Sequence, residues 1–253
     1  METQIQLLAK EFNQNETHVK NVVDLIDEGY TIPFIARYRK EMHGAMDDTT
    51  LRDLADRLSY LRNLAERRDE IKKSIASQDK LTDELNRQID EAKTLAVLED
   101  LYRPYKQKRR TRATIAKEKG LEPLATRLFA QEKDLPAPET LARQFIDPEK
   151  GVNTVEEALA GASDIIAETI SDDAAIRARL RDVIGKNAKV GSSAVKEEDS
   201  VYRLYYQFDQ PISRLQSHQI LAINRGEKEG FLKVNLDLDR DLALGSVKHA
   251  VVK

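Results

Sequence analysis

Apolar residues recur every three to four positions along most of the chain, the spacing that places them on one face of an α-helix. The pattern is clear in residues 5–12 and again in 18–29. The stripe of the second segment consists of Val19, Val22, Val23 and Ile26. Asn15 is suited to the N-cap of the second helix, and Gly29 to the position just after its end. We predict two short packed helices, with a helix-turn-helix as the alternative interpretation.

The longest helical pattern covers residues 46–78, which contain neither glycine nor proline. Asp47 or Asp48 can cap its start. Its apolar face consists of Leu51, Leu54, Leu58, Leu61, Ala65, Ile71 and Ile75. About 30 residues at 1.5 Å each make a helix roughly 45 Å long. Arg68 and Lys72 interrupt the stripe, so we predict one long bracing helix rather than a sustained coiled coil.

Several shorter helical patterns follow, and the pattern changes near residue 186. Residues 185–193 are rich in Gly, Ser and Lys and indicate a linker or a short extended piece, whereas 199–208 look aromatic and helical. Residues 231–239 alternate strictly and predict a strand. One strand is not stable alone, so we expect its partner strands beyond residue 253.

The predicted fold class is therefore mainly α: a helical bundle with a long central helix, and the start of a small α/β region near the C-terminus. We divide the chain into a helical domain, 1–190, and a segment, 191–253, that leads into a sheet-containing domain.

Composition excludes several classes of protein. Charged residues make up 34% of the chain and aromatic residues 6%, which suits long, surface-rich helices. Cysteine is absent, so there is no disulfide framework and no cysteine-based zinc site. The N-terminus does not have the pattern of a signal peptide, and no apolar run has the roughly 18 residues needed to span a bilayer. We expect a soluble, intracellular protein without a membrane partner.

Residues with catalytic or metal-binding potential are scattered. The four histidines lie far apart in sequence and lack metal-ligand spacing, and Ser217 beside His218 is not by itself a nucleophile–base pair. Residues 224–230 hold two glycines but follow a helix, the reverse of a phosphate-binding loop. We therefore expect no catalytic residues, no metal site and no cofactor, and predict that the chain is not an enzyme.

Charge is unevenly distributed, although the net charge is only −3. Residues 101–120 hold eight Lys/Arg and one Glu, whereas 135–184 hold ten acidic and five basic residues. Next to Tyr102 and Tyr105 stand the cations Arg103, Lys106, Lys108, Arg109, Arg110 and Arg112, here called the basic segment. Cations neutralise phosphate and tyrosine rings stack on bases, so the segment is a candidate nucleic-acid site. The alternatives are a solvated loop or pairing with the chain's own acids.

Residues 31–44 join an apolar block to a cationic one. Ile32, Phe34 and Ile35 should anchor the segment in the core, where Phe34→Ala would cost about 3–5 kcal/mol if the ring is fully buried. The cations that follow are Arg37, Arg39 and Lys40. An anchored cation loses less entropy on pairing than a free one. Its partner is either a phosphate or an acid of this chain, such as Glu99 or Asp100.

Four stretches, 30–48, 98–125, 157–168 and 217–230, resemble the N-terminal half of Tex-type transcription accessory proteins. These proteins are also similar to a nuclear transcription elongation and histone-chaperone factor. The resemblance implies a bacterial cytoplasmic protein that binds nucleic acid and affects transcription. Full-length members carry an RNase H-like domain, a helix-hairpin-helix region and an S1 domain, none of which this chain shows, so we expect an N-terminal fragment. Gln219 departs from the family's usual Arg at that position.

The functional hypothesis is a nucleic-acid-associated scaffold in transcription, which binds RNA or DNA weakly and without sequence preference and contacts the transcription machinery. The first alternative is a protein–protein interaction module that docks a transcription partner through residues 101–120 or 135–184. The second is a nuclease whose catalytic domain lies outside this chain.

Overall fold

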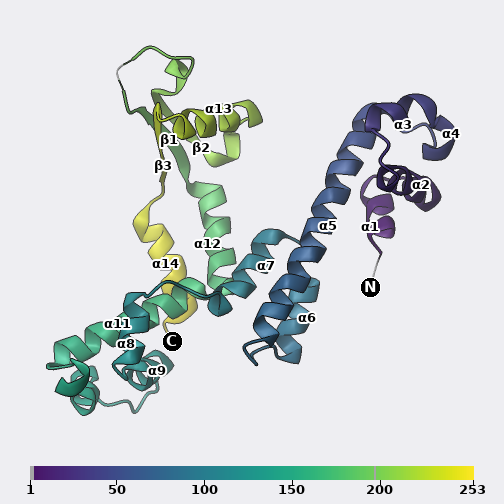
Figure 1. The fold of residues 1–253 in the computed structure, drawn as a ribbon. Coiled ribbons are helices and arrows are strands. Elements are labelled where there is room, and N and C mark those ends of the chain that lie inside the picture. The colour runs from purple at the N-terminus through teal and green to yellow at the C-terminus, as the bar shows by residue number, and fades with distance from the viewer. Residues whose placement is uncertain (1–2, 197) are drawn as a thin grey trace. The chain divides into compact units, whose positions relative to one another are not determined.

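The computed structural model describes residues 3–196 and 198–253, and within them the chain forms fourteen α-helices and three strands. The chain divides into two compact units, residues 1–99 and 100–253. The boundary between them falls inside α7, Leu95–Tyr102 (Figure 1). The mainly helical class, with a small sheet near the C-terminus, is confirmed. A domain division at residues 190/191 stays a prediction.

The first unit begins with two short helices, as the apolar spacing predicts. Its helices are α1 Gln4–Glu11, α2 Glu16–Asp27, α3 Ile32–Tyr38, α4 Lys40–His43, α5 Asp48–Ala76 and α6 Asp83–Glu91. Helices α1, α2 and α3 pack against α5 around a core that includes Leu8, Val19, Val22, Ile35, Leu51 and Leu54. Asn15 caps α2 by accepting a 2.8 Å hydrogen bond from the Thr17 amide. Gly29 follows the C-cap with φ 88°. The helix-turn-helix interpretation stays a prediction.

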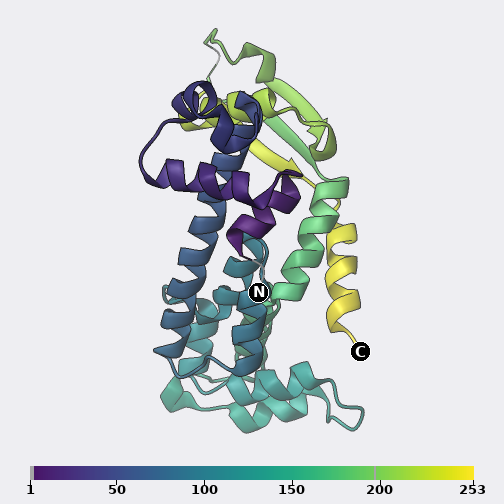
Figure 2. The same cartoon turned by 90° about the vertical axis from the view of Figure 1, so that its right-hand side faces the viewer.

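Helix α5 is the long helix that the sequence predicts, with 29 residues and Asp47 as its N-cap. Helix α6 returns beside the C-terminal half of α5 (Figures 1 and 2). Arg68 donates to the Ile89 carbonyl at 3.0 Å, and Lys72 pairs with Asp90 at 2.6 Å. The two cations that interrupt the apolar stripe therefore both contact α6.

The helical part of the second unit packs through small side chains. Its helices are α8 Arg112–Glu118, α9 Glu122–Ala130, α10 Pro138–Ala142 and α11 Val155–Asp172, with the 3-10 turns η1 Arg103–Tyr105, η2 Arg143–Phe145 and η3 Pro148–Lys150. Ala113, Ala116, Ala158 and Ala162 are buried between them. A Cβ on Gly161 would lie 2.4 Å from Cδ1 of Leu121, so the side chain of Leu121 would have to move to admit one. Small residues of α11 therefore lie where the helix packs against α8 and α9.

Helices α12, Ala174–Asn187, and α14, Arg240–Val251, lie side by side in both views (Figures 1 and 2). Residues 251–253 are hydrogen-bonded to Gln131, the C-cap residue of α9. The side chain of Gln131 donates to the Val251 carbonyl at 2.8 Å and accepts from the Lys253 amide at 3.1 Å.

Three antiparallel strands form one sheet in the order β2-β1-β3. They are β1 Lys189–Ala194, β2 Gln207–Pro211 and β3 Leu232–Asp237, with the turns η4 Arg203–Tyr205 and η5 Ile212–Arg214 between them. Helix α13, Ser217–Lys228, packs on β3. The alternating strand is confirmed as β3.

Two expectations about this region are wrong. The partner of β3 precedes it in the chain, because β1 pairs with β3 in the register Gly191↔Asn235. Residues 189–194 form the short extended piece that was one of the two alternatives for 185–193, but glycine and serine give no apolar alternation that would mark it as a sheet strand. Residues 199–208 form only a short 3-10 turn before entering β2, so they are not a helix.

Within residues 3–196 and 198–253, no helix combines the length and the apolar character that crossing a membrane requires.

Candidate nucleic-acid interface

The segment that joins α3 to α4 is fixed to the core by one face of α3. Ile35 is fully buried, and Ile32 and Ala36 pack against the same core. Arg39 leaves helical geometry, with φ −131° and ψ 36°, and so separates the two helices. The predicted anchor is thus confirmed for Ile35. Phe34 is only half-buried and lies outside the core cluster, so its expected role as a core residue is wrong.

Phe34 belongs instead to a row of three rings, here called the ring platform: Tyr30, Phe34 and Tyr38. The rings of Tyr30 and Phe34 stack nearly parallel, with centroids 5.0 Å apart and planes 11° apart. Those of Phe34 and Tyr38 lie 5.2 Å apart at 46°. Phe34 and Tyr38 are four residues apart in α3 and so share one side of the helix, whereas Tyr30 precedes α3 and stacks on Phe34 from the segment before the N-cap Thr31. Tyr38 remains 58% exposed.

Arg39 is held against the ring platform. Its guanidinium carbon lies 5.4 Å from the centroid of Phe34 and 5.8 Å from that of Tyr30, and Nη1 donates to the Tyr38 carbonyl at 3.2 Å. A cation over an aromatic face is attracted by the negative face of the ring. The guanidinium is therefore positioned before any ligand arrives.

Arg37 and Lys40 are exposed, and no ion pair joins either to an acid among the described residues. The two acids proposed as their partners have arginine partners elsewhere: Glu99 accepts from Arg67 at 2.6 Å, and Asp100 is bound by α12. The partner of these two cations, a phosphate or an acid of this chain, therefore stays a prediction. Glu41 is the one acid between residues 37 and 41.

Four cations of the basic segment are paired within the second unit. Three of them meet the acidic stripe of α11, here Asp164, Glu168 and Asp172, whose spacing of four places them on one face. Arg103 lies 3.0 Å from Asp172, Lys108 contacts Asp172 and lies 3.3 Å from Glu168, and Arg112 lies 3.3 Å from Asp164. The fourth, Arg110, lies 2.8 Å from Glu118. This geometry favours the internal-pairing alternative for these four residues.

Lys106 and Arg109 differ from the other cations of the basic segment. Both are exposed, and within the described residues neither forms an ion pair with an acid. They are the members of the segment that remain available to an external phosphate. The assignment of the whole segment to nucleic acid stays a prediction.

Asp100 is nearly buried and is bound by two arginines of α12. Oδ1 accepts from Nε of Arg177 at 2.7 Å, and Oδ2 accepts from Arg181. Burial by itself would raise the pKa of this carboxyl, but the hydrogen bonds and charges of Arg181 and Arg177 outweigh it and hold the pKa below its usual range. This group ties α7 to α12 and is structural rather than ligand-binding.

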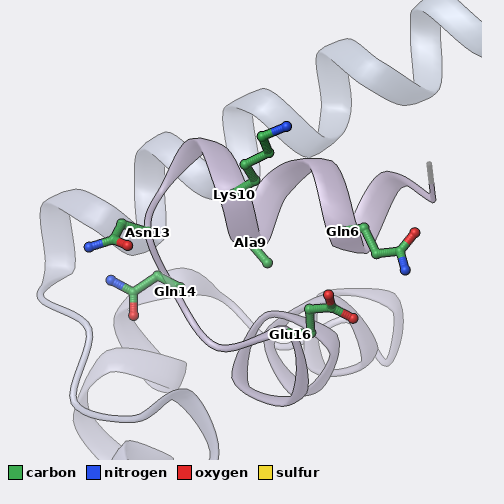
Figure 3. Close-up of a pocket in the computed structure, with 6 residues that line it drawn as sticks. All are labelled: Gln6, Ala9, Lys10, Asn13, Gln14 and Glu16. Carbon is green, nitrogen blue, oxygen red and sulfur yellow. The ribbon is translucent and has the colours of Figure 1, made fainter.

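An open pocket of about 600 Å³ lies where α1 turns into α2 (Figure 3). Amide and charged side chains line it, with one buried apolar group, Ala9. The lining is Gln6, Ala9, Lys10, Asn13, Gln14 and Glu16. Its shallow polar surface offers hydrogen bonds but no nucleophile–base arrangement. Within the described residues, no group of three or more His, Cys, Asp or Glu is placed to hold a metal ion.

The sequence analysis did not identify Tyr30 and Tyr38 as candidate site residues, because it singled out the cations of 31–44 and not the aromatic rings. The signal was present, because aromatic residues at 30, 34 and 38 recur every four positions. That spacing would have indicated a stack of rings beside the cations.

Two family models match this chain: "Tex-like protein N-terminal domain" over residues 2–76 and "Tex central region-like" over 133–252. The chain belongs to the Tex-like family. The ring platform and its cations lie inside the first match, and the acidic stripe of α11 lies inside the second. The basic segment falls between the two matched ranges.

Named relatives agree with this assignment. The chain is 44% identical to "Protein tex" of Bordetella pertussis over 97% of its own length, and 40% identical to "Transcriptional accessory protein Tex" of Neisseria gonorrhoeae over 93%. It is 31% identical over 92% of its length to the human "S1 RNA-binding domain-containing protein 1". The chain spans 31% of each of these two bacterial relatives and 24% of the human one.

Proposed function

We propose that this chain is a non-catalytic, nucleic-acid-associated part of a cytoplasmic transcription accessory factor. The observation that carries the proposal is a pair of exposed cations, Arg37 and Lys40, which have no acid partner among the described residues and which the buried Ile35 anchors beside the ring platform. Membership of the Tex-like family supports it, as do relatives named for transcription and for RNA binding. Contacts of Lys and Arg with phosphate carry no sequence information and release counterions, so binding through them is sequence-independent and falls with added salt.

The cations are not equivalent in this proposal. Arg37, Arg39 and Lys40 of the first unit, and Lys106 and Arg109 of the second, contact phosphate. Arg103, Lys108, Arg110 and Arg112 already neutralise acids of this chain. These four hold the segment on α11 and α8 and contribute little to binding.

The test measures binding of fluorescent single- and double-stranded DNA and RNA over a series of salt concentrations. The variant Arg37→Gln/Lys40→Gln removes two candidate phosphate contacts. The slope of log K against log salt should lose roughly 1.4 to 1.8 units of magnitude, since each contact contributes about 0.7 to 0.9.

A matched control removes the same charge elsewhere on the first unit. Lys20 and Arg52 are exposed and paired with Asp24 and Asp48 at 2.7 Å each, so Lys20→Gln/Arg52→Gln should leave the slope unchanged. The proposal is wrong if the chain binds no nucleic acid at low salt, or if both double variants change the slope equally.

Protein docking is a second candidate, favoured by apolar side chains in the second unit. Val201, Leu204 and Leu221 expose 86%, 84% and 70% of their surface. Isolated exposed apolar residues are common, but three with this much exposure in one 21-residue stretch favour contact with another protein. Replacing all three by serine should abolish such a contact without changing the salt dependence of nucleic-acid binding.

A further inference from the structure

We propose that the ring platform binds the bases of single-stranded nucleic acid by stacking, and that Tyr38 is the ring that a base meets. The inference rests on the proposed function and adds to it the form of nucleic acid and the contact that selects it.

The geometry of the rings leaves Tyr38 accessible to a ligand. Tyr30 and Phe34 cover each other as a near-parallel pair, whereas Tyr38 is tilted by 46° and is the most exposed of the three. The row advances by 5.0 and then 5.2 Å between centroids. A base that extends the row beyond Tyr38 meets a ring already braced from behind by Phe34. Little side-chain freedom is lost when that base stacks.

Stacking requires an unpaired base. In a duplex, both faces of a base pair are covered by neighbouring pairs, whereas the bases of a single strand can rotate outward onto an aromatic ring. The platform should therefore prefer single strands. It should also tolerate any sequence, since every base has a flat face.

The charges around the platform complement a phosphate backbone. Residues 37–41 hold three cations and one acid, Glu41. Arg39 is fixed against the rings of Phe34 and Tyr30, and Arg37 and Lys40 flank Tyr38 in sequence without ion-pair partners among the described residues. Rings for bases and cations for phosphates, within one short segment, form the combination that single-strand binders use.

The exposed ring is not needed to complete the core. Ile35 is fully buried, and Ile32 and Ala36 complete the contact of α3 with the core, while Tyr38 leaves most of its surface in solvent. Replacing Tyr38 should therefore leave the fold intact, which allows binding to be tested separately from stability.

The experiment compares Tyr38→Ala and Tyr38→Phe in the whole chain, with three probes: oligo(dT), an abasic oligonucleotide of the same length, and a duplex. Thermal melting first verifies that both variants fold. Tyr38→Ala should weaken oligo(dT) binding by about 5- to 100-fold, the usual range for one base–ring stack. Tyr38→Phe should retain binding because it retains the ring. The abasic strand, which offers phosphate without bases, should bind both variants and the parent alike.

The outcomes separate this inference from the proposed function. If the parent binds salt-dependently but Tyr38→Ala binds oligo(dT) as well as the parent does, the stacking inference is wrong and the proposed function stands. Equal losses on the abasic strand, or a preference of the parent for duplex, also overturn the inference. If the parent binds none of the three probes, the proposed function itself fails.

Discussion

A Cβ atom on Gly44 would lie 2.1 Å from Nδ1 of His18, so the imidazole ring occupies the space of a side chain. Gly44 also ends α4 in the left-handed region, with φ 63°. We expect Gly44→Ala to be strongly destabilising in urea unfolding. Gly29 has φ 88° and no atom within 4 Å of its Cβ position. Gly29→Ala should thus show the backbone cost alone, about 1–2 kcal/mol. Equal losses for the two variants would show that His18 moves away freely.

Replacing Gly185 or Gly245 by alanine should raise stability, in contrast to Gly44 and Gly29. Both lie inside helices, α12 and α14, and a Cβ at either would meet no atom within 4 Å. Alanine should stabilise each helix by about 0.5–1 kcal/mol, because it reduces the backbone entropy lost on folding. Urea unfolding of the two single variants and the double variant measures this gain. A lower midpoint in either single variant would contradict the prediction.

Ile35→Ala should cost more stability than Phe34→Ala. Truncating a fully buried isoleucine costs about 2–5 kcal/mol, because it leaves a cavity in the core of the first unit. The half-buried ring of Phe34 loses stacking contacts but opens no core cavity, so its cost should be smaller than the roughly 3–5 kcal/mol of a buried phenylalanine. Thermal and urea unfolding compare the free energy of unfolding of the two variants. A larger loss of stability for Phe34→Ala than for Ile35→Ala would mean that the ring belongs to the core.

Asp100 should make stability depend on pH in acid. Its pKa is lower in the folded chain than in the unfolded one, so its contribution is complete above about pH 4 and is lost as the pH falls through the lower folded pKa. Asp100→Asn should cost about 2–3 kcal/mol at neutral pH, since two arginines lose a charged acceptor. The difference from the parent should shrink on acidification, as urea unfolding between neutral pH and pH 2 would show.

Asp27 provides the control for Asp100. It forms a similar pair of hydrogen bonds, to Arg62 at 2.6 and 2.8 Å, but at an exposed position. Asp27→Asn should cost at most about 1 kcal/mol, because solvent and salt screen exposed pairs. A loss as large as that of Asp100→Asn would mean that burial does not decide the contribution of these pairs.

Secondary-structure elements that are specified by nearby residues could be predicted from the sequence. The long helix α5, the cap at Asn15 and strand β3 depend on periodicity and on neighbours a few residues away. For strand β1 the sequence left a linker and a short extended piece as alternatives, because Gly191, Ser192 and Ser193 show no apolar alternation and the strand is specified by its two neighbours in the sheet.

The candidate site was predictable only in part, for a similar reason. The spacing of the acids on α11 is visible in the sequence, but Lys108 and Asp172 are 64 positions apart, and their pairing depends on how α11 packs. Sequence alone could not separate Lys106 and Arg109 from the four paired cations around them. Nor could it show that Ile35, rather than Phe34, enters the core.

The order of the strands has a consequence for synthesis of the chain. The first strand made, β1, is the middle strand, and its second neighbour begins 38 residues after β1 ends. At roughly 5–20 residues per second, a ribosome needs about 2–8 s to reach β3 after completing β1. During that interval the backbone N–H and C=O groups along one edge of β1 have no partner strand. They can then form hydrogen bonds with any extended strand nearby. The nascent chain is therefore most exposed to misassembly between the emergence of β1 and that of β3.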